Sequence, residues 1–102
     1  MVLYVMTWDI CNDTRDGYGP WAQQALQQVL STGDVVEFRA YRPATGAAEV
    51  AATYEFADMA SFAHWHESEA VKAVFAAMRQ YCDNVSAELW GPSPIVPAPI
   101  RS

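Results

Sequence analysis

The chain has 102 residues, a length typical of one domain, and 52% of them are hydrophobic. A domain this small cannot hide so much apolar surface by itself, so the composition favours a partner surface. The net charge of −6, with only six scattered Lys and Arg residues, argues against nucleic acid and anionic membranes as partners, and no apolar run is long enough to cross a bilayer.

The first third of the chain predicts a strand followed by a helix. Residues 2–10 (VLYVMTWDI) are β-branched and aromatic with no breaker, which is typical of a strand with two covered faces. Residues 12–19 (NDTRDGYG) predict a loop, and Pro20 suits the first turn of a helix. Apolar residues then recur at helical spacing over 21–30, and Gly33 is the expected residue after the helix end.

A hairpin is predicted next, from two alternating runs around the turn 43–46 (PATG). In the first run, 35–42, the alternation places Val36, Phe38 and Ala40 on one face. In the second run, 49–56, Tyr54 and Phe56 lie on the apolar face. Both apolar faces are expected to meet the helices.

The last third predicts helical segments, a strand and a tail. Asp58 is a candidate N-cap for a short helix, and Ser68 is a candidate cap for a second segment that is either continuous with the first or separate. Asp83 and Asn84 predict a break before a strand over 85–90. Residues 92–102 carry four prolines and predict an extended tail.

The resulting order is β-α-β-β-α-β over residues 1–91. Right-handed connections fold this order into a ferredoxin-like α+β domain, a four-stranded antiparallel sheet with two helices on one face. The other face of the sheet is left bare. It is polar in part, but it also carries the apolar residues Leu3, Val5, Ala51 and Trp90. This pattern predicts a homodimer that forms through the open sheet face.

The junction of the third strand and the second helix resembles a known family. The run YEFADMASFAH over 54–64, followed by ESEA over 67–70, is similar to that of the dimeric α+β barrel superfamily, and within it the antibiotic biosynthesis monooxygenase-like proteins. The resemblance implies a homodimer whose two sheets form a barrel, and a pocket in each subunit between sheet and helices. The chain has Ala70 and Val71 where many relatives have a second histidine.

His64 and His66 are the only histidines, so any imidazole chemistry must use them. Positions i and i+2 of a helix point to nearly opposite sides, so the two are poor partners for one metal, and no metal site is predicted. One of them is a candidate catalytic base or donor toward a phenol or enol. The alternative is a half-exposed histidine paired with a glutamate.

Aromatic residues gather on the helix side of the predicted sheet. They are interpreted either as a packed core or as the wall of a cavity for a flat ligand. The candidate substrate-binding residues of that cavity are Tyr4, Trp8, Tyr54, Phe62 and Trp65. Their hydroxyl and indole groups need partners when buried, and a ligand oxygen would serve.

Cys11 and Cys82 are far apart in sequence and lie outside any C-x-x-C motif, so two free thiols in a reducing compartment are expected. The predicted topology brings them into one region, which leaves a disulfide open. Residues 1–8 lack the features of a signal peptide, and a cytoplasmic location is therefore expected. No phosphate loop, zinc spacing or nucleophile elbow is present.

Together with the resemblance, these observations predict a small homodimeric protein that binds a small aromatic molecule, and the resemblance implies that this molecule is polyketide-like. The resemblance implies a cofactor-independent monooxygenase, in which the carbanion of the substrate reacts with oxygen. Two alternatives stay open: a non-oxidative cyclase or isomerase on the same fold, and a dimeric binding or accessory protein without catalysis.

Overall fold

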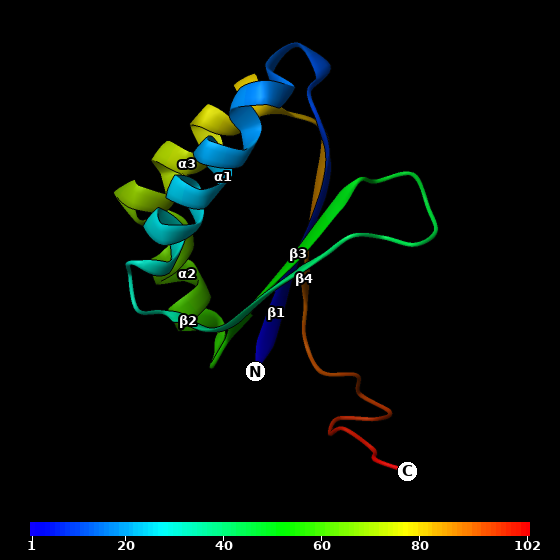
Figure 1. Cartoon of the computed structure of the whole chain (residues 1–102). Coiled ribbons are helices and arrows are strands. Elements are labelled where there is room, and N and C mark those ends of the chain that lie inside the picture. The colour runs from blue at the N-terminus through cyan, green and yellow to red at the C-terminus, as the bar shows by residue number, and fades with distance from the viewer.

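A computed structural model describes all of residues 1–102 and shows one antiparallel sheet with every helix on the same side (Figure 1). The elements in chain order are β1 (Val2–Ile10), the 3-10 turn η1 (Asn12–Thr14), α1 (Arg15–Leu30), β2 (Val35–Tyr41), β3 (Val50–Phe56), α2 (Met59–Glu67), α3 (Glu69–Tyr81) and β4 (Cys82–Trp90). The predicted ferredoxin-like α+β plan is confirmed, with three helices instead of two.

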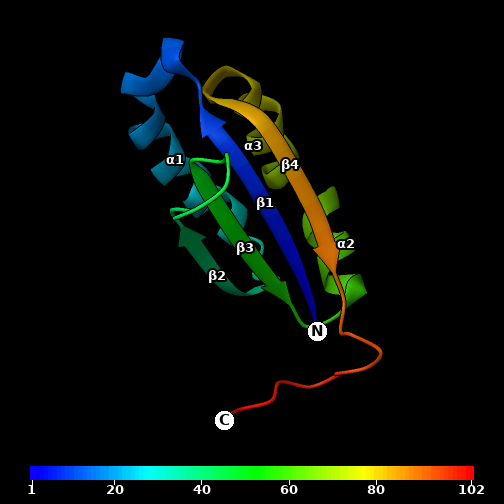
Figure 2. The ribbon, with the colours of Figure 1, turned by 90° about the vertical axis from the view of Figure 1, so that its right-hand side faces the viewer.

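The strands lie in the order β2-β3-β1-β4 (Figure 2). The two central strands, β1 and β3, are therefore the first and the third in sequence, as right-handed crossovers require. Figure 2 looks onto the open face of this sheet, which no element of the chain covers. The loop between β2 and β3 projects beyond the sheet on the side away from the helices (Figure 1).

Each of the two helices in the second helical region, α2 and α3, begins at a side-chain cap. The Asp58 carboxylate accepts a hydrogen bond from the Ser61 N–H at 2.8 Å, and the Ser68 hydroxyl accepts one from the Val71 N–H at 3.3 Å. Ser68 has an extended backbone, with a ψ of 146°, so the chain turns there between the helices. Both predicted caps are confirmed, and each satisfies a helix N–H that has no partner within the helix.

The beginning of α1 differs from the prediction. Residues 12–19 were expected to form a loop, but α1 begins at Arg15 and contains Pro20 in its interior. Contacts from distant parts of the chain hold this first turn: Arg15 pairs with Glu49 at 3.1 Å, and the Thr14 hydroxyl donates to the Gln80 carbonyl at 2.6 Å. Tertiary packing therefore outweighs the weak helix propensity of two glycines and a proline.

Two bulges correct the predicted strands. In β2, Val35 pairs with Phe56 and Glu37 with Glu55, so Val36 is an extra residue and lies exposed. Val35, and not Val36, therefore packs against the core. In β4 the strand starts at Cys82 rather than after a break.

The bulge in β4 is centred on Asn84, the one non-glycine residue with a positive φ, 53°. Asparagine tolerates this left-handed backbone because its short amide can form local hydrogen bonds. Here the Asn84 amide donates to the Asp9 carboxylate on β1 at 2.9 Å. The residues predicted as a break are thus part of the strand, and the bulge fastens β4 to β1.

Trp65 lies at the centre of the core. Its side chain is 0% exposed, and its indole N–H donates to the Val29 carbonyl at 2.7 Å. Val29 belongs to the last turn of α1, where carbonyls have no partner within the helix. The ring centroids of Tyr54 and Phe56 lie 5.0 and 5.1 Å from that of Trp65. One side chain of α2 thus fixes the end of α1 above the central strand β3.

The tail after β4 leaves the domain next to the N-terminus and packs on no element (Figures 1 and 2). Ile95 and Ile100 are 87% and 82% exposed. None of the helices is both long and apolar enough to serve as a membrane span.

Replacing Trp65 with phenylalanine tests the role of this indole. Trp65→Phe keeps an aromatic ring but leaves the buried Val29 carbonyl without its donor, which should lower the free energy of unfolding by about 1–3 kcal/mol. Urea unfolding followed by circular dichroism measures this loss. Trp21→Phe is the matched control, since Trp21 is half-exposed and can keep its stacking on Tyr81 as a phenylalanine. Equal losses in the two variants would contradict the assigned role.

Candidate functional site

An apolar cavity of about 230 Å³ lies between α1 and the sheet. It is lined by 17 residues, of which 16 are hydrophobic and one, Gln23, is polar. The wall residues come from α1, α3 and the three strands β1, β2 and β3: Met6, Trp8, Tyr18, Trp21, Ala22, Gln23, Ala25, Leu26, Val29, Phe38, Ala40, Val50, Ala52, Tyr54, Val74, Phe75 and Met78. Such a space suits a small, mostly apolar molecule.

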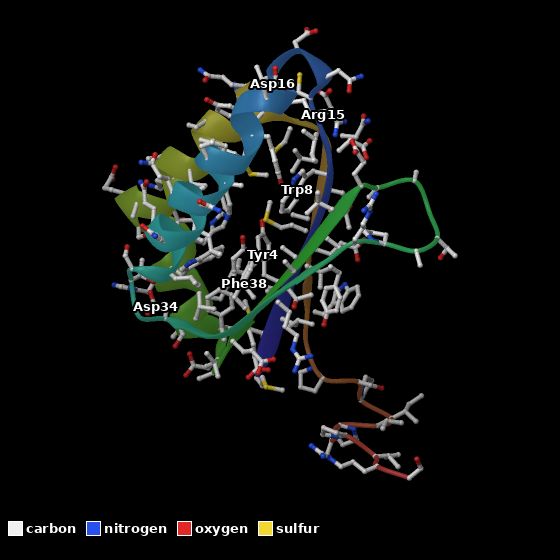
Figure 3. The ribbon with its side chains drawn as sticks, viewed as in Figure 1. Tyr4, Trp8, Arg15, Asp16, Asp34 and Phe38 are labelled. Atoms are coloured by element: carbon white, nitrogen blue, oxygen red, sulfur yellow. The ribbon has the colours of Figure 1, made fainter.

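The cavity exists because alanines meet alanines across the two layers. In the sheet, Ala40 of β2 pairs with Ala52 of β3, and Ala52 pairs on its other side with Met6 of β1. Above this floor, α1 contributes Ala22 and Ala25. Because these side chains are only methyl groups, they leave the space between α1 and the sheet unfilled at this position. Figure 3 shows the larger side chains of Trp8 and Phe38 reaching from the sheet toward the helices.

Tyr18 and Trp8 bring a polar pair to the cavity wall. The Trp8 indole N–H donates to the Tyr18 hydroxyl oxygen at 3.0 Å. Because the oxygen already accepts this bond, the hydroxyl hydrogen of Tyr18 is free to donate elsewhere. Burial is the main cause that raises the pKa of Tyr18, although the bond from Trp8 lowers it in part. Tyr18 is therefore a neutral donor at physiological pH.

Tyr54 provides a second hydroxyl. It is buried, and burial raises its pKa well above the ordinary value, with smaller contributions from Tyr4 and Tyr18 and none from a hydrogen bond. No buried side-chain oxygen or nitrogen lacks a hydrogen-bond partner. The Tyr54 hydroxyl bonds no protein group, so its oxygen is not fully enclosed, and Tyr54 is one of the residues that line the cavity. It is available to a ligand or a water as a neutral donor.

The predicted substrate-binding residues fall into two groups. Trp8 and Tyr54 line the cavity. Tyr4, Phe62 and Trp65 lie outside its lining and form an aromatic cluster under α2, with the Tyr4 ring 5.2 Å from Phe62 and 5.8 Å from Trp65. This cluster fills the space between the sheet and α2. The expected packed core therefore describes the α2 side, and the expected cavity describes the α1 side.

Neither histidine lines the cavity. His64 is largely exposed on α2, and its Nδ1 lies 2.7 Å from the Asp34 carboxylate. His66 stacks on Phe62, with ring centroids 5.3 Å apart, and its ring lies 6.1 Å from that of Phe75. The expected pairing of a histidine with glutamate is thus replaced, for His64, by a pairing with Asp34. The catalytic role of either histidine stays a prediction.

Cys11 and Cys82 come to the same end of the sheet, as the topology predicts, and both are free thiols. The backbone N–H of Cys11 donates to the Tyr81 carbonyl beside Cys82. Burial, followed by the charges of Asp83 and Cys11, raises the pKa of the Cys82 thiol to about 11. At neutral pH this thiol is protonated and a weak nucleophile. No group of three His, Cys, Asp or Glu side chains is placed to hold a metal ion.

Of the lining residues, only Trp8 and Tyr54 were predicted as site residues, and Tyr18 and the alanines are among those that were not. Tyr18 lies in the stretch expected to be a loop. Ala40 and Ala52 were assigned to the helix side of the sheet, but that they are neighbours follows only from the register of β2 against β3. Small residues at equal distances from the hairpin turn are the signal that could have located the cavity.

Comparison with known proteins supports the fold. Neither a scan of protein-family models nor a search of curated protein sequences finds a match. A dabb family protein with a ferredoxin-like fold from Mesorhizobium loti gives a TM-score of 0.77 at 12% identity, over 90% of this chain and 96% of that protein.

Two further solved structures are similar over most of the chain. SnoaB, a cofactor-independent oxygenase from Streptomyces nogalater, gives a TM-score of 0.71 at 11% identity, over 87% of this chain and 89% of that protein. HapK from Hahella chejuensis gives a TM-score of 0.72 at 13% identity, over 100% of this chain and 99% of that protein. These similarities confirm the ferredoxin-like fold that the resemblance implied.

Filling the cavity should abolish ligand binding. Ala52→Leu places extra carbon atoms into the empty space, so the fluorescence rise of 1-aminoanthracene on binding should fall at least tenfold. Ala87→Leu is the matched control, because Ala87 also pairs with Met6 but lies exposed on β4 and outside the cavity lining. Undiminished binding to Ala52→Leu would show that the dye binds elsewhere.

Proposed function

We propose that this chain binds a small planar aromatic molecule between α1 and the sheet and oxidises it with molecular oxygen, without a cofactor. The observation that carries the proposal is the cavity itself: an aromatic, almost wholly apolar space with two neutral phenol donors, Tyr18 and Tyr54, at its wall. A polyketide-like ring system with one or two oxygens matches this combination.

The two hydroxyls can stabilise charge that develops on a substrate oxygen. A carbon acid next to a ring carbonyl loses its proton more easily when its enolate oxygen accepts hydrogen bonds from donors already in place. Tyr18 is held by Trp8, and Tyr54 is held by the core around it. Neither side chain has to reorganise, and the apolar walls strengthen each bond by excluding water.

The oxidation then uses the electrons of the substrate. The carbanion reacts with oxygen to form a carbon–oxygen bond and a peroxide, which takes up a proton. Cleavage of the oxygen–oxygen bond then converts the original CH₂ group to C=O and releases one water. One atom of oxygen enters the product and the other enters the water, so no other reductant is needed. The protein contributes orientation and hydrogen bonds.

The base that removes the first proton is not among the lining residues, since none of them is Asp, Glu, His or Lys. We retain His64 and His66 as the proposed bases or donors, with Tyr4, Phe62 and Trp65 beside them. This assignment requires a substrate that reaches the α2 side of the sheet. The competing route is loss of the proton to water from a substrate held by Tyr18 and Tyr54.

The open face of the sheet supports the proposal of a homodimer. On it lie the half-buried Leu3 and Val5 of β1 and Ala51 of β3, together with Trp90 of β4, which is 51% exposed. Figure 2 shows that nothing in the chain covers this face. Packing two such faces would remove this apolar area from water.

Two free thiols also fit the proposed cytoplasmic location.

Oxygen uptake with anthrone tests the activity. The wild type should consume oxygen above the protein-free rate, and Tyr54→Phe should lose roughly tenfold or more, because one donor to the developing oxyanion is removed. Tyr41→Phe, exposed on β2, is the control.

A loss confined to a His64→Ala/His66→Ala double variant would move the chemistry to α2. Product formation without oxygen would favour a cyclase or isomerase, and binding without turnover would favour an accessory protein.

Sedimentation equilibrium tests the dimer. The wild type should sediment as a dimer, whereas Val5→Asp should sediment as a monomer, because it would bury an unpaired charge at the centre of the interface. Ala73→Asp on the exposed side of α3 should stay dimeric. A monomeric wild type at micromolar concentration would overturn the proposed assembly.

A further inference from the structure

A second, polar hollow of about 520 Å³ lies on the outer side of α1, next to the cavity. The two spaces share Trp21 and Gln23 in their walls. Gln23 is the one polar residue of the cavity lining and is exposed to solvent. This residue therefore marks the place where the apolar cavity meets the surface, and the hollow, named here the amide groove, adjoins that mouth.

The amide groove carries no charge. Gln23, Gln24 and Gln27 line it, and α1 has no charged residue anywhere from Gly17 to Leu30. This is unusual for an exposed helix face in a chain with 18% charged residues. Each glutamine amide both donates and accepts hydrogen bonds. A neutral ligand with several hydroxyl groups matches such a surface better than an anion or a cation does.

A flat aromatic wall completes the groove. The rings of Trp21 and Tyr81 stack with centroids 4.7 Å apart and planes at 10°. Gly17 lies against the Tyr81 ring, because a Cβ at this position would be 3.5 Å from the ring, in ordinary van der Waals contact. The electron-rich face of such a ring attracts polarised C–H groups, which a sugar ring presents on its apolar side. The rings are fixed by each other and need no rearrangement.

We propose that the amide groove binds the neutral polyhydroxylated end, such as a sugar, of the ligand whose aromatic body occupies the cavity. The ligand passes between the two spaces beside Trp21 and Gln23, which border both. This proposal rests on the proposed function, because it assumes that the cavity holds an aromatic ring system. The substrate class becomes a glycosylated or polyhydroxylated aromatic compound.

Isothermal calorimetry with emodin and with emodin glucoside tests the inference. The wild type should bind the glucoside about tenfold more tightly than emodin, as one or two added neutral hydrogen bonds would give. In Gln24→Ala/Gln27→Ala this preference should disappear, while the affinity for emodin stays unchanged. The substitutions are on an exposed helix face and favour the helix, so folding is retained.

Gln28→Ala is the matched control and should keep the preference, because Gln28 donates to the Ala70 carbonyl at 3.1 Å and lies outside the groove. Binding of emodin with equal or weaker binding of the glucoside would overturn this inference and leave the cavity proposal intact. A preference that survives in the double variant would overturn it as well. Failure of both compounds to bind would overturn the proposed function itself, and this inference with it.

Discussion

The hydrogen bond from the Trp65 indole to the Val29 carbonyl is the constraint on which the interior of this domain depends. It joins the last turn of α1 to α2, so two helices that are separated by a hairpin in sequence are held at a fixed height over β3. A helix end placed over an apolar sheet has carbonyls that water cannot reach. Trp65 satisfies one of them and fills the surrounding space with the same side chain.

This one contact divides the space between sheet and helices. On the α2 side, the Trp65 ring and its aromatic neighbours fill the volume. On the α1 side, Trp65 bonds the end of the helix, and Arg15 and Thr14 bond its beginning to other parts of the chain. The alanines between these two points face each other across a gap. Bonded ends and small residues at the middle are the physical origin of the cavity.

The sequence contained enough information for the fold and for part of the candidate site. Alternating and helical periodicities predicted each strand and the helical regions, and the caps Asp58 and Ser68 were identified from residue type alone. The start of α1 was missed because its stability comes from Glu49 and Gln80, which are distant in sequence. The bulge at Val36 reversed one assignment, since a single extra residue changes which side chain faces the core.

The cavity lining was predictable to the extent that it depends on which face a residue occupies. The alternation of their strands placed Trp8 and Tyr54 on the helix side of the sheet, where both line the cavity. The contributions of Tyr18 and of the Ala40–Ala52 pair depend on helix placement and strand register, which local pattern does not specify. The surroundings of the two histidines depend on the path of α2, which places His64 beside Asp34 and His66 beside Phe62.

Under the proposed oxidation, the two methionines in the cavity wall, Met6 and Met78, would affect the working life of the protein. A thioether next to a peroxide is readily converted to a sulfoxide, which is polar and bulkier than the parent side chain. Met6 forms part of the cavity floor beside Ala52, so the first sulfoxide would fill the space proposed for the substrate. A catalyst built in this way would carry its own limit on the number of turnovers, and its working life would depend on methionine sulfoxide repair.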